Sequence, residues 1–404
     1  MDLTGKTIAV AVTGGIAAYK ACDFVRELYR RNAERVLCIM TPNAAEFVTT
    51  LTLQALSRYP VFTETLAVDH GGIPIHIVIA QQADALVVLP ATADSLCKLA
   101  HGAADNLVTT SVITFTGKPV IVVPAMNTRM WDHPLTRQNL DTIRQLPNYV
   151  IVEPTSGNLA CGETGDGHLA DQETILQALY QSVHPEKNLF KGIKAIVTAG
   201  GTSEPIDPVR VISNRSSGKM GLALADELYA MGATVTLIST KPPNHRLYDV
   251  ITVKTASDMQ TELNTRFEDT DLLLMAAAIS DYTPANPAEH KIKREQQLTP
   301  TLALTPNPDI LASLGQRKRT GQLLVGFAAE SQDLLKNATD KFHRKNLDAI
   351  AANDISRTDI GFEADQNEMT LILANGNHHK LERDRKDRIA RNLLLTLHEQ
   401  LLKS

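Results

Sequence analysis

Short, uniformly apolar runs alternate with helix-patterned segments along most of this 404-residue chain. The first half contains the runs KTIAVAVT, RVLCIMT, ADALVVLPA, KPVIVVPA and YVIVEP, with helical patterns such as Ala17 to Arg31 between them. Strands that are apolar on both faces belong to a parallel sheet with helices on each side. The second half repeats this rhythm from KAIVTAG to LDAIAAND, then adds a hairpin pattern and an amphipathic C-terminal helix. We therefore predict an α/β fold with two doubly wound, Rossmann-like domains.

The stretch HPEKNLFKG mixes proline, glycine and charge between the two sets of strands. Such a composition is typical of a linker. A chain of this length also exceeds what one hydrophobic core usually organises. We place the boundary near Lys187 to Phe190, which gives domains 1–190 and 191–404.

Composition and charge exclude several classes of protein. A formal net charge of -5 provides no basic field, so we expect no nucleic-acid partner. The first residues lack the basic region and cleavage site of a signal peptide, and no apolar run reaches the ~20 residues of a membrane span. The four cysteines show no C-x-x-C spacing, which argues against a zinc knot or a disulfide framework. We expect a cytoplasmic protein with no membrane partner.

In open parallel sheets, ligands bind beyond the carboxyl ends of the strands. Gly14 and Gly15 follow the first strand, where they serve either the approach of a phosphate or a tight turn. Asn127 lies in PAMNTRMW after a later strand, where an asparagine can either cap the following helix or bind a ligand. On the residues alone, His76 in its apolar alternation fits a core histidine, and Cys161 in GNLACGETGDGHLAD fits an incidental surface thiol.

Two of these strand-end stretches, LPATADS and PAMNTRMW, resemble the signatures of the flavin-containing cysteine decarboxylases, and HGAADNLVTT resembles the segment that lines their FMN site. The resemblance implies an FMN cofactor and three catalytic residues. His76 would be the catalytic histidine, Asn127 would hold the substrate carboxylate, and Cys161 would lie in a flap that closes over the substrate. The implied cofactor-binding residues are Gly14, Gly15, Thr41, Pro90, Thr92, Asp105, Asn106 and Met126.

Decarboxylation of a cysteine carboxylate needs an electron sink, because the carbanion left by CO₂ has nowhere to delocalise. The resemblance implies that FMN supplies this sink by accepting electrons from the C–S bond and returning them afterwards. The returning step also needs a proton, and a thiol with a pKa near ~8.5 is a suitable donor at neutral pH. That role falls to Cys161.

The second half carries a glycine-rich segment, TAGGTSEPIDPVRVISNRSSGKMG, after its first strand. A P-loop is poorly supported, because Lys219 is followed by Met220 instead of Ser or Thr. Two lysine pairs follow later in the chain. Lys291 and Lys293 lie two residues apart, and Lys341 and Lys345 lie one helical turn apart. On the residues alone, both pairs fit a solvated basic surface.

These second-half segments resemble the phosphopantothenate-cysteine ligases, with departures at Gly201, Ser203 and Arg215. Over the whole chain, the resemblance is to the bacterial bifunctional proteins of coenzyme A synthesis, which join this ligase to a phosphopantothenoylcysteine decarboxylase. It implies that Asn214 and Lys291 are catalytic and that Asp281 binds Mg²⁺. The implied nucleotide-binding residues are Ala276, Ala277, Asp281, Lys291, Lys293, Asn307, Pro308, Asp309, Ile310, Phe327, Lys341 and Lys345.

The resemblance further implies that the ligase half couples 4′-phosphopantothenate to cysteine through an acyl-cytidylate, with CTP converted to CMP and pyrophosphate. The product, phosphopantothenoylcysteine, would then be decarboxylated to 4′-phosphopantetheine. CTP and ATP are indistinguishable on the residues. The implied assembly is a homo-oligomer with a trimeric flavin half, FMN at the subunit interface and a dimeric ligase half, which together permit a dodecamer.

Three other functions compete with this interpretation. A flavin-binding regulatory or scaffold protein would keep the flavin site without turnover, but it would not require His76, Asn127 and Cys161 together. A prenylated-flavin-forming transferase would leave the second half unexplained. An NAD-dependent oxidoreductase would need a G-x-G-x-x-G fingerprint and an acidic ribose partner, and both are missing from the first strand-helix turn.

Overall fold

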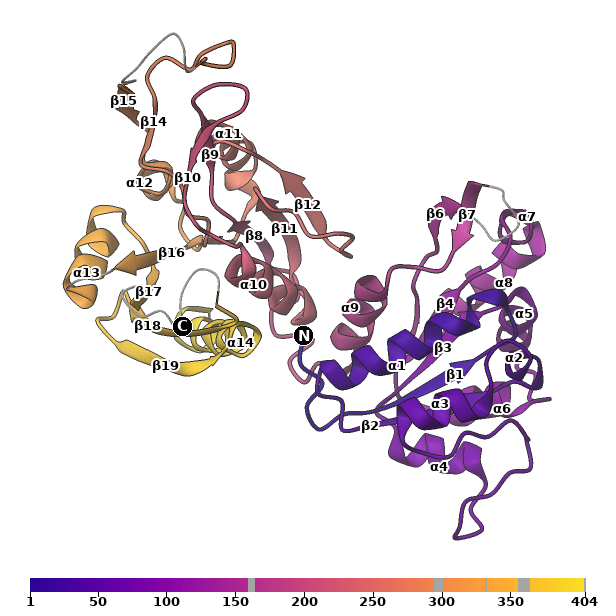
Figure 1. Ribbon diagram of the computed structural model, residues 1–404. Helices are drawn as coiled ribbons and strands as arrows, with labels where there is room; N and C mark the ends of the chain where they lie inside the picture. Colours follow the sequence, from indigo (N-terminus) through magenta and orange to yellow (C-terminus); the bar gives the residue numbers. More distant parts are fainter. Residues whose placement is uncertain (159–163, 294–300, 331–332, 355–363, 403–404) are drawn as a thin grey trace. The chain divides into compact units, whose positions relative to one another are not determined.

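The computed structural model describes residues 1–158, 164–293, 301–330, 333–354 and 364–402. The chain forms two compact units, Met1–Pro185 and Glu186–Ser404, and each contains a largely parallel sheet with helices packed on its faces (Figure 1). The predicted α/β class with two doubly wound halves is confirmed. Phe190, which the sequence places at the end of the first domain, is fully buried in the core of the second unit.

The first unit is built on a five-stranded parallel sheet with the order β2-β1-β3-β4-β5. All residues of β1, β3 and β4 are buried, because helices cover both faces of these central strands. An additional antiparallel hairpin, β6-β7, follows the sheet. The strands are β1 (Thr7–Val12), β2 (Arg35–Met40), β3 (Ala85–Ala91), β4 (Val120–Pro124), β5 (Tyr149–Ile151), β6 (Thr155–Asn158) and β7 (Thr164–His168).

The helices of the first unit bury their apolar residues at helical spacing. For example, α9 buries Ile175, Ala178 and Leu179. The helices are η1 (Ile16–Tyr19), α1 (Lys20–Arg30), α2 (Pro42–Ala45), α3 (Thr50–Ser57), α4 (Ile75–Gln82), α5 (Ala93–His101), α6 (Leu107–Thr114), α7 (Thr128–Trp131), α8 (Pro134–Arg144) and α9 (Gln172–Val183).

The second unit is built on an eight-stranded sheet with the order β12-β11-β8-β13-β16-β17-β18-β19. Its first six strands are parallel and in Rossmann order, so the chain reverses direction across the sheet between β8 and β13. Two short antiparallel pairs, β9-β10 and β14-β15, lie outside the sheet. The strands are β8 (Lys194–Ala199), β9 (Ser203–Pro205), β10 (Val211–Ser213), β11 (Thr234–Ser239), β12 (Asp249–Thr252), β13 (Leu272–Met275), β14 (Tyr282–Pro284), β15 (Leu304–Pro306), β16 (Leu323–Glu330), β17 (Ala349–Asp354), β18 (Gln366–Leu373) and β19 (His378–Arg385).

The predicted hairpin near the end of the chain is the antiparallel pair β18-β19, which extends the sheet to its edge. The helix after it packs Ile389, Leu393 and Leu397 into the core as an amphipathic helix does. The helices of this unit are α10 (Lys219–Ala230), α11 (Ala256–Arg266), η2 (Phe267–Asp269), α12 (Ile310–Arg317), α13 (Leu334–Arg344), α14 (Lys386–Leu397) and η4 (His398–Leu402).

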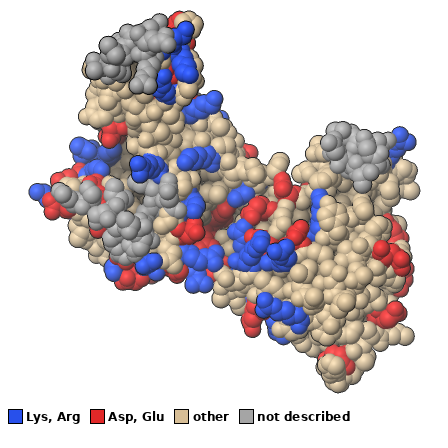
Figure 2. All heavy atoms as spheres, in the orientation of Figure 1, with Lys and Arg blue, Asp and Glu red and all other residues tan. Residues whose placement is uncertain are grey.

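Acidic and basic side chains lie near one another over much of the face drawn in Figure 2. Exposed ion pairs include Arg144–Asp141 in the first unit and Lys380–Glu382 in the second. Among the described helices, none combines the length and the apolar character needed to cross a bilayer.

Candidate functional site

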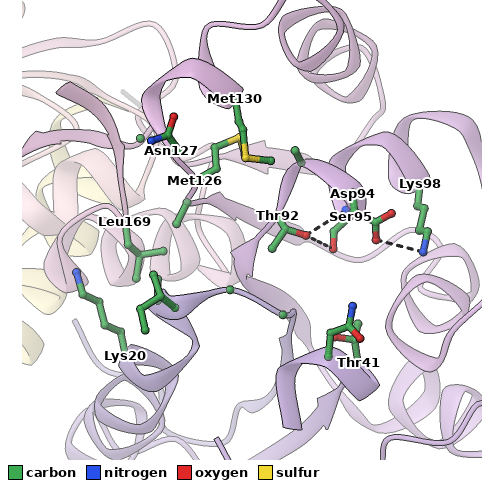
Figure 3. Close-up of a pocket in the computed structure, with 18 of the residues that line it drawn as sticks. Lys20, Thr41, Thr92, Asp94, Ser95, Lys98, Met126, Asn127, Met130 and Leu169 are labelled. Atoms are coloured by element: carbon green, nitrogen blue, oxygen red, sulfur yellow. Dashed lines mark hydrogen bonds and ion pairs between the residues drawn. The ribbon is translucent and has the colours of Figure 1, made fainter. Parts of the chain in front are cut away.

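Loops at the carboxyl ends of the strands in the first unit enclose a pocket of about 840 Å³ (Figure 3). This volume lies within the range of small-molecule and cofactor sites. The lining comes from the loops after β1, β2, β3 and β4 and from the end of β7, so segments far apart in the sequence meet at one edge of the sheet. Of the predicted residues, those that line the pocket are Gly14, Gly15, Thr41, Thr92, Asp105, Asn106, Met126 and Asn127.

Two glycines are required by the close packing of this pocket. A Cβ atom on Gly14 would lie 2.5 Å from the Cβ atom of Asn43, so the loops after β1 and β2 can approach only with glycine there. Gly167 has a φ of +120° and leaves no room for a Cβ, which would lie 2.3 Å from the Met126 carbonyl oxygen. The Gly167 carbonyl in turn accepts a hydrogen bond from the Met126 N–H at 3.0 Å.

Several predicted residues act as N-caps of helices that begin at the pocket. The Thr41 hydroxyl accepts the Ala44 N–H, the Thr92 hydroxyl accepts the Ser95 N–H, and Asn106 forms a capping box with Thr109. Helix N-termini carry partial positive charge and favour anionic groups, so this edge of the sheet suits a phosphate.

Asn127 is also a cap, because its Oδ1 accepts the Arg129 N–H at 2.8 Å at the start of α7. Its side chain nevertheless lines the pocket beside Met126 and Met130 (Figure 3). Both functions that the sequence left open for this residue are therefore compatible with its position.

The pocket contains two lysines with different surroundings. Lys98 bonds Asp105 at 3.0 Å and Asp94 at 3.1 Å, and its hydrogen bond holds the pKa of Asp105 below its ordinary value. Lys20 instead lies 3.2 Å from Nε2 of His168. Burial lowers the pKa of Lys20, although the charge of Asp171 opposes that shift.

Two predicted residues of the first unit, Pro90 and His76, stand apart from this lining. Pro90 is buried in β3, and its carbonyl accepts the Thr13 hydroxyl at 2.7 Å, so it shapes the strand end without lining the pocket. His76 is half-buried in α4 and does not line the pocket of its own chain. Cys161 lies outside the described residues.

The apolar alternation around His76 is helical, not extended. Pro74 precedes the helix, and Ile75 and Ile79 are buried one turn apart. This spacing explains why alternate apolar residues do not form a strand here. The Nδ1 atom of His76 is buried and has no hydrogen-bond partner among the described residues.

In the second unit, the predicted residues gather near the point where the strand order reverses. Asn214 donates from Nδ2 to the carbonyls of Ala278 and Ile279, at 3.2 Å each. Asn307 donates from Nδ2 to the Ser280 carbonyl at 2.8 Å, and its N–H bonds the Asp281 carbonyl. The segments after β10, β13 and β15 therefore meet, with Asp281 exposed among them.

The remaining predicted nucleotide contacts differ in exposure. Ala276, Ala277 and Phe327 are partly buried against the core clusters, whereas Pro308 is exposed. Ile310 is only 3% exposed and packs in the core at the start of α12. A contact from Ile310 to a ligand would therefore have to come from its backbone.

The second lysine pair is held by carboxylates. Lys341 in α13 bonds Glu330 at 2.6 Å, and Lys345, at the end of the same helix, bonds Asp309 at 2.9 Å. Burial disfavours ionisation of Asp309, but Lys345 and the Ala312 N–H outweigh it and hold the Asp309 pKa below its ordinary value.

Lys291 and Lys293 are both exposed. They lie in an irregular segment that follows β14.

The side chains that line the pocket of the first unit without having been predicted from the sequence include Lys20, Ser95, Lys98 and His168. Lys20 and Ser95 fall within the strand-end stretches TGGIAAYK and LPATADS, so their position in the chain was a usable signal. Lys98 reaches the pocket from within α5, and His168 reaches it from the β6-β7 hairpin. Neither position directly follows a strand of the parallel sheet, so the expectation that ligands bind at strand ends does not identify them.

The comparisons with known proteins divide the chain in the same way. The family described as Flavoprotein matches residues 1–184, and the DNA/pantothenate metabolism flavoprotein C-terminal domain matches residues 190–401. The coenzyme A biosynthesis bifunctional protein CoaBC of Bacillus subtilis is 40% identical over 383 residues, which span 94% of this chain and 93% of that protein. The protein of the same name from Haemophilus influenzae is 40% identical over 410 residues, which span 100% of both chains.

A solved structure of the C-terminal domain of a coenzyme A biosynthesis bifunctional protein CoaBC is also similar. It is 33% identical, covers 54% of this chain and 100% of that domain, and has a TM-score of 0.45. The two full-length relatives confirm the resemblance inferred from the strand-end motifs. The chain belongs to the family of coenzyme A biosynthesis bifunctional proteins.

Proposed function

We propose that this protein catalyses two consecutive reactions of coenzyme A synthesis. The second unit joins 4′-phosphopantothenate to cysteine, and the first unit decarboxylates the resulting phosphopantothenoylcysteine to 4′-phosphopantetheine. One observation carries the proposal: residues of the flavoprotein motifs from four separate strand ends line one pocket of cofactor size. The full-length similarity to bifunctional relatives supports a second reaction in the second unit.

The pocket of the first unit suits FMN. Gly14 and Gly15 leave backbone exposed beside the helix starts at Thr41 and Thr92, where a phosphate would be stabilised. Met126, Met130 and Leu169 offer apolar surface for a flat ring system (Figure 3). Asp105 and Asn106 would contribute polar contacts at the pocket edge. When bound, FMN supplies the electron sink that cysteine decarboxylation needs.

The chain's own residues then divide the work. Asn127 holds the substrate carboxylate from the start of α7, His76 assists up to the loss of CO₂, and Cys161 donates a proton afterwards. Of these residues, Asn127 is the one that lines the pocket of its own chain in the described structure.

The position of His76 favours a homo-oligomer. A histidine outside its own pocket can take part in the reaction if it faces the pocket of a neighbouring copy. Apolar side chains at the pocket support such an interface, since Ile16 is 60% exposed and Tyr19 is 56% exposed. We propose a trimer of first units with FMN at the interface, and dimers of second units that link trimers into a dodecamer.

The ligase reaction requires activation of a carboxylate, which is a poor electrophile toward an amine. We propose that 4′-phosphopantothenate attacks the α-phosphorus of CTP, which releases pyrophosphate and forms an acyl-cytidylate. The cysteine amine then displaces CMP. Lys291, Lys293, Lys341 and Lys345 stabilise the triphosphate charge, and Asn214 orders the switch-point loops that hold the acyl group.

Asp281 suits a shared Mg²⁺ site. No group of three or more potential ligands from His, Cys, Asp and Glu occurs in the part of the chain that the structure describes. Mg²⁺ often uses one or two protein carboxylates together with substrate phosphates, and Asp281 is exposed at the meeting point of the loops. The free thiols of Cys22, Cys38 and Cys97 suit the reducing cytoplasm, where we propose that the protein acts.

Incubation of the full chain with 4′-phosphopantothenate, cysteine, CTP and Mg²⁺ tests both halves together. We expect a yellow protein that releases pyrophosphate and CO₂ and yields 4′-phosphopantetheine by mass analysis. A yellow protein that makes neither product would be a flavin-binding scaffold. Equal rates with ATP and CTP would overturn the assignment of CTP.

A further inference from the structure

The segment that carries Lys291 and Lys293 lies between β14 and the undescribed residues, and it has no regular secondary structure. Both lysines are exposed, so their side chains do not fix the backbone by packing. The peptide groups of Ile292 are instead hydrogen-bonded on both sides. Its N–H donates to Oδ2 of Asp207 at 3.2 Å, and its carbonyl accepts from Arg210 at 2.8 Å.

The partner of this segment is the turn between β9 and β10. Oδ1 of Asp207 accepts the N–H groups of Val209 and Arg210 at 2.8 Å each, which shapes the turn. A third contact joins the same two segments, because the Ala288 N–H donates to the Ile206 carbonyl at 2.9 Å. One carboxylate therefore both forms the turn and holds the lysine segment against it.

The side chain of Asp207 is fully buried. Burial opposes ionisation, but the N–H groups of Val209, Ile292 and Arg210 outweigh it and keep the pKa of Asp207 below its ordinary value. The charge of Arg210 acts in the same direction, at 3.7 Å. The residue is thus an anion at neutral pH, and it accepts hydrogen bonds from three backbone N–H groups.

The same hairpin leads directly to Asn214. β10 ends at Ser213, and the Ser213 hydroxyl donates to the Thr202 carbonyl at 2.8 Å, so the hairpin is tied down on the side toward Asn214 as well. The β9-β10 hairpin therefore joins the two parts of the proposed ligase site, with the Asn214 loop at one end and the lysine segment at the Asp207 turn.

We propose that Asp207 is a positioning residue for the ligase reaction, which sets the backbone of residues 291–293 so that a lysine faces the nucleotide triphosphate. This inference rests on the proposed ligase function. Asp207 does not touch the nucleotide. It acts by holding the Ile292 peptide in one orientation, which in turn fixes the direction of the two flanking side chains.

Asp207→Asn tests this without a change of size. The variant keeps one side-chain oxygen, but its NH₂ group must face either the Ile292 N–H or the N–H groups of the turn. Asp258→Asn is a matched control, because Asp258 in the same unit also accepts two backbone N–H groups, from Lys254 and Thr255, at the start of α11. Hydrogen exchange of the full chain should become faster around Ile292 in Asp207→Asn and stay unchanged there in Asp258→Asn.

Kinetics then separate positioning from general loss of structure. Pyrophosphate release with CTP should fall about tenfold in kcat/KM for Asp207→Asn, while decarboxylation by the same chain stays normal. A double-mutant cycle uses whichever of Lys291→Gln and Lys293→Gln lowers pyrophosphate release by itself. Because Asp207 acts through that lysine, adding Asp207→Asn to the lysine variant should lower kcat/KM for pyrophosphate release by less than about twofold further.

Additive losses in the cycle would overturn the inference, as would an unchanged exchange rate around Ile292 or an equal ligase loss in Asp258→Asn. The proposed function fails separately, if the unmodified chain makes no pyrophosphate and no amide. A misfolded Asp207→Asn chain is recognised by faster exchange throughout the second unit, and Asp207→Glu then replaces it, with the longer carboxylate expected to restore part of the activity.

Discussion

The two units share a parallel-sheet architecture but build their candidate sites differently. In the first unit, loops from successive strand ends converge on one pocket, and four of the residues involved also cap helices. In the second unit, the candidate residues come from the strand-order reversal, from a helix end and from an irregular segment held by a buried carboxylate. A site made of strand-end loops is fixed by the sheet itself, whereas a site made of lysines depends on each lysine's hydrogen-bond and ion-pair partners.

This difference predicts which substitutions act through backbone packing and which through charge. Backbone changes should strongly affect the first-unit site, because a Cβ atom at Gly14 or Gly167 would collide with a neighbouring loop of the pocket. In the second unit, substitutions that change a charge should have the largest effects on the ligase reaction. The predictions below run from the largest expected effect to the smallest.

Gly167→Ala should abolish the first-unit site. The added Cβ would lie 2.3 Å from the Met126 carbonyl oxygen, and φ is +120°, so the hairpin must move away from the pocket. We expect loss of the flavin absorbance and at least about a hundredfold lower CO₂ release, with pyrophosphate release intact. Gly71→Ala is the control, since its Cβ would meet Asp69 at an ordinary 3.4 Å. A yellow, active Gly167→Ala protein would contradict the close packing of this pocket.

Lys291→Gln should lower pyrophosphate release about a hundredfold while leaving decarboxylation normal, because it removes a charge that we propose stabilises the triphosphate in the transition state. Lys191→Gln is the control, as another exposed lysine of the same unit. If Lys291→Gln is normal and Lys293→Gln is not, the catalytic lysine is the second of the pair. If both are normal, the segment is ordinary basic surface.

Asn214→Asp should reduce amide formation about tenfold. Its side-chain nitrogen donates to the carbonyls of Ala278 and Ile279, and a carboxylate in its place would face two acceptors. Mass analysis for the acyl-cytidylate shows whether this intermediate still forms. CO₂ release from added phosphopantothenoylcysteine should continue. Equal loss of both reactions would mean that the two units do not work independently.

Asp309→Asn should have the smallest effect, and one that depends on pH. The Asp309 pKa is lowered in the folded protein, so its stabilisation is complete above the ordinary aspartate pKa of about 3.9 and is lost as pH falls through the lowered value. Asparagine retains a cap for α12 but loses the Lys345 pair. Because Asp309 is 45% exposed, solvent screening limits the pair to ~0.5 kcal/mol.

Hydrogen exchange of α12 measures this effect locally. At pH 6 we expect about twofold less protection in Asp309→Asn than in the unmodified protein, which corresponds to the ~0.5 kcal/mol of a screened pair. The difference should begin to shrink below about pH 4 and disappear once the pH falls below the lowered Asp309 pKa, where the unmodified carboxylate is itself protonated. A difference that grows on acidification would show that another group is responsible.

Much of the fold was predictable because strand burial leaves a direct trace in the sequence. The runs that became β1, β3 and β4 are apolar throughout, and each is buried throughout. The segment around His76 was harder, because alternate isoleucines fit both a strand and one face of a short helix. The hairpins β9-β10 and β14-β15 are only three residues per strand, which is too short for a periodic pattern.

The candidate sites were predictable only where the chain order determines proximity. Gly14, Thr92 and Asn127 each follow a strand, so a parallel sheet must bring them to one edge. The pair Lys345–Asp309 joins residues 36 positions apart through the packing of α12 and α13. No local pattern encodes such a pair, and the same is true of the contact between Asp207 and Ile292.

The strand β19 ends the eight-stranded sheet of the second unit, so one of its sides has no neighbouring strand in that sheet. An open strand edge is a template for pairing with another chain, and therefore a route to aggregation. The sequence of β19, HHKLERDR, alternates one buried position, Leu381, with a dense set of charged and imidazole side chains. A second strand that paired with this edge would place its side chains next to positive and negative charges at successive positions. Such an edge therefore disfavours the growth of one continuous sheet between molecules.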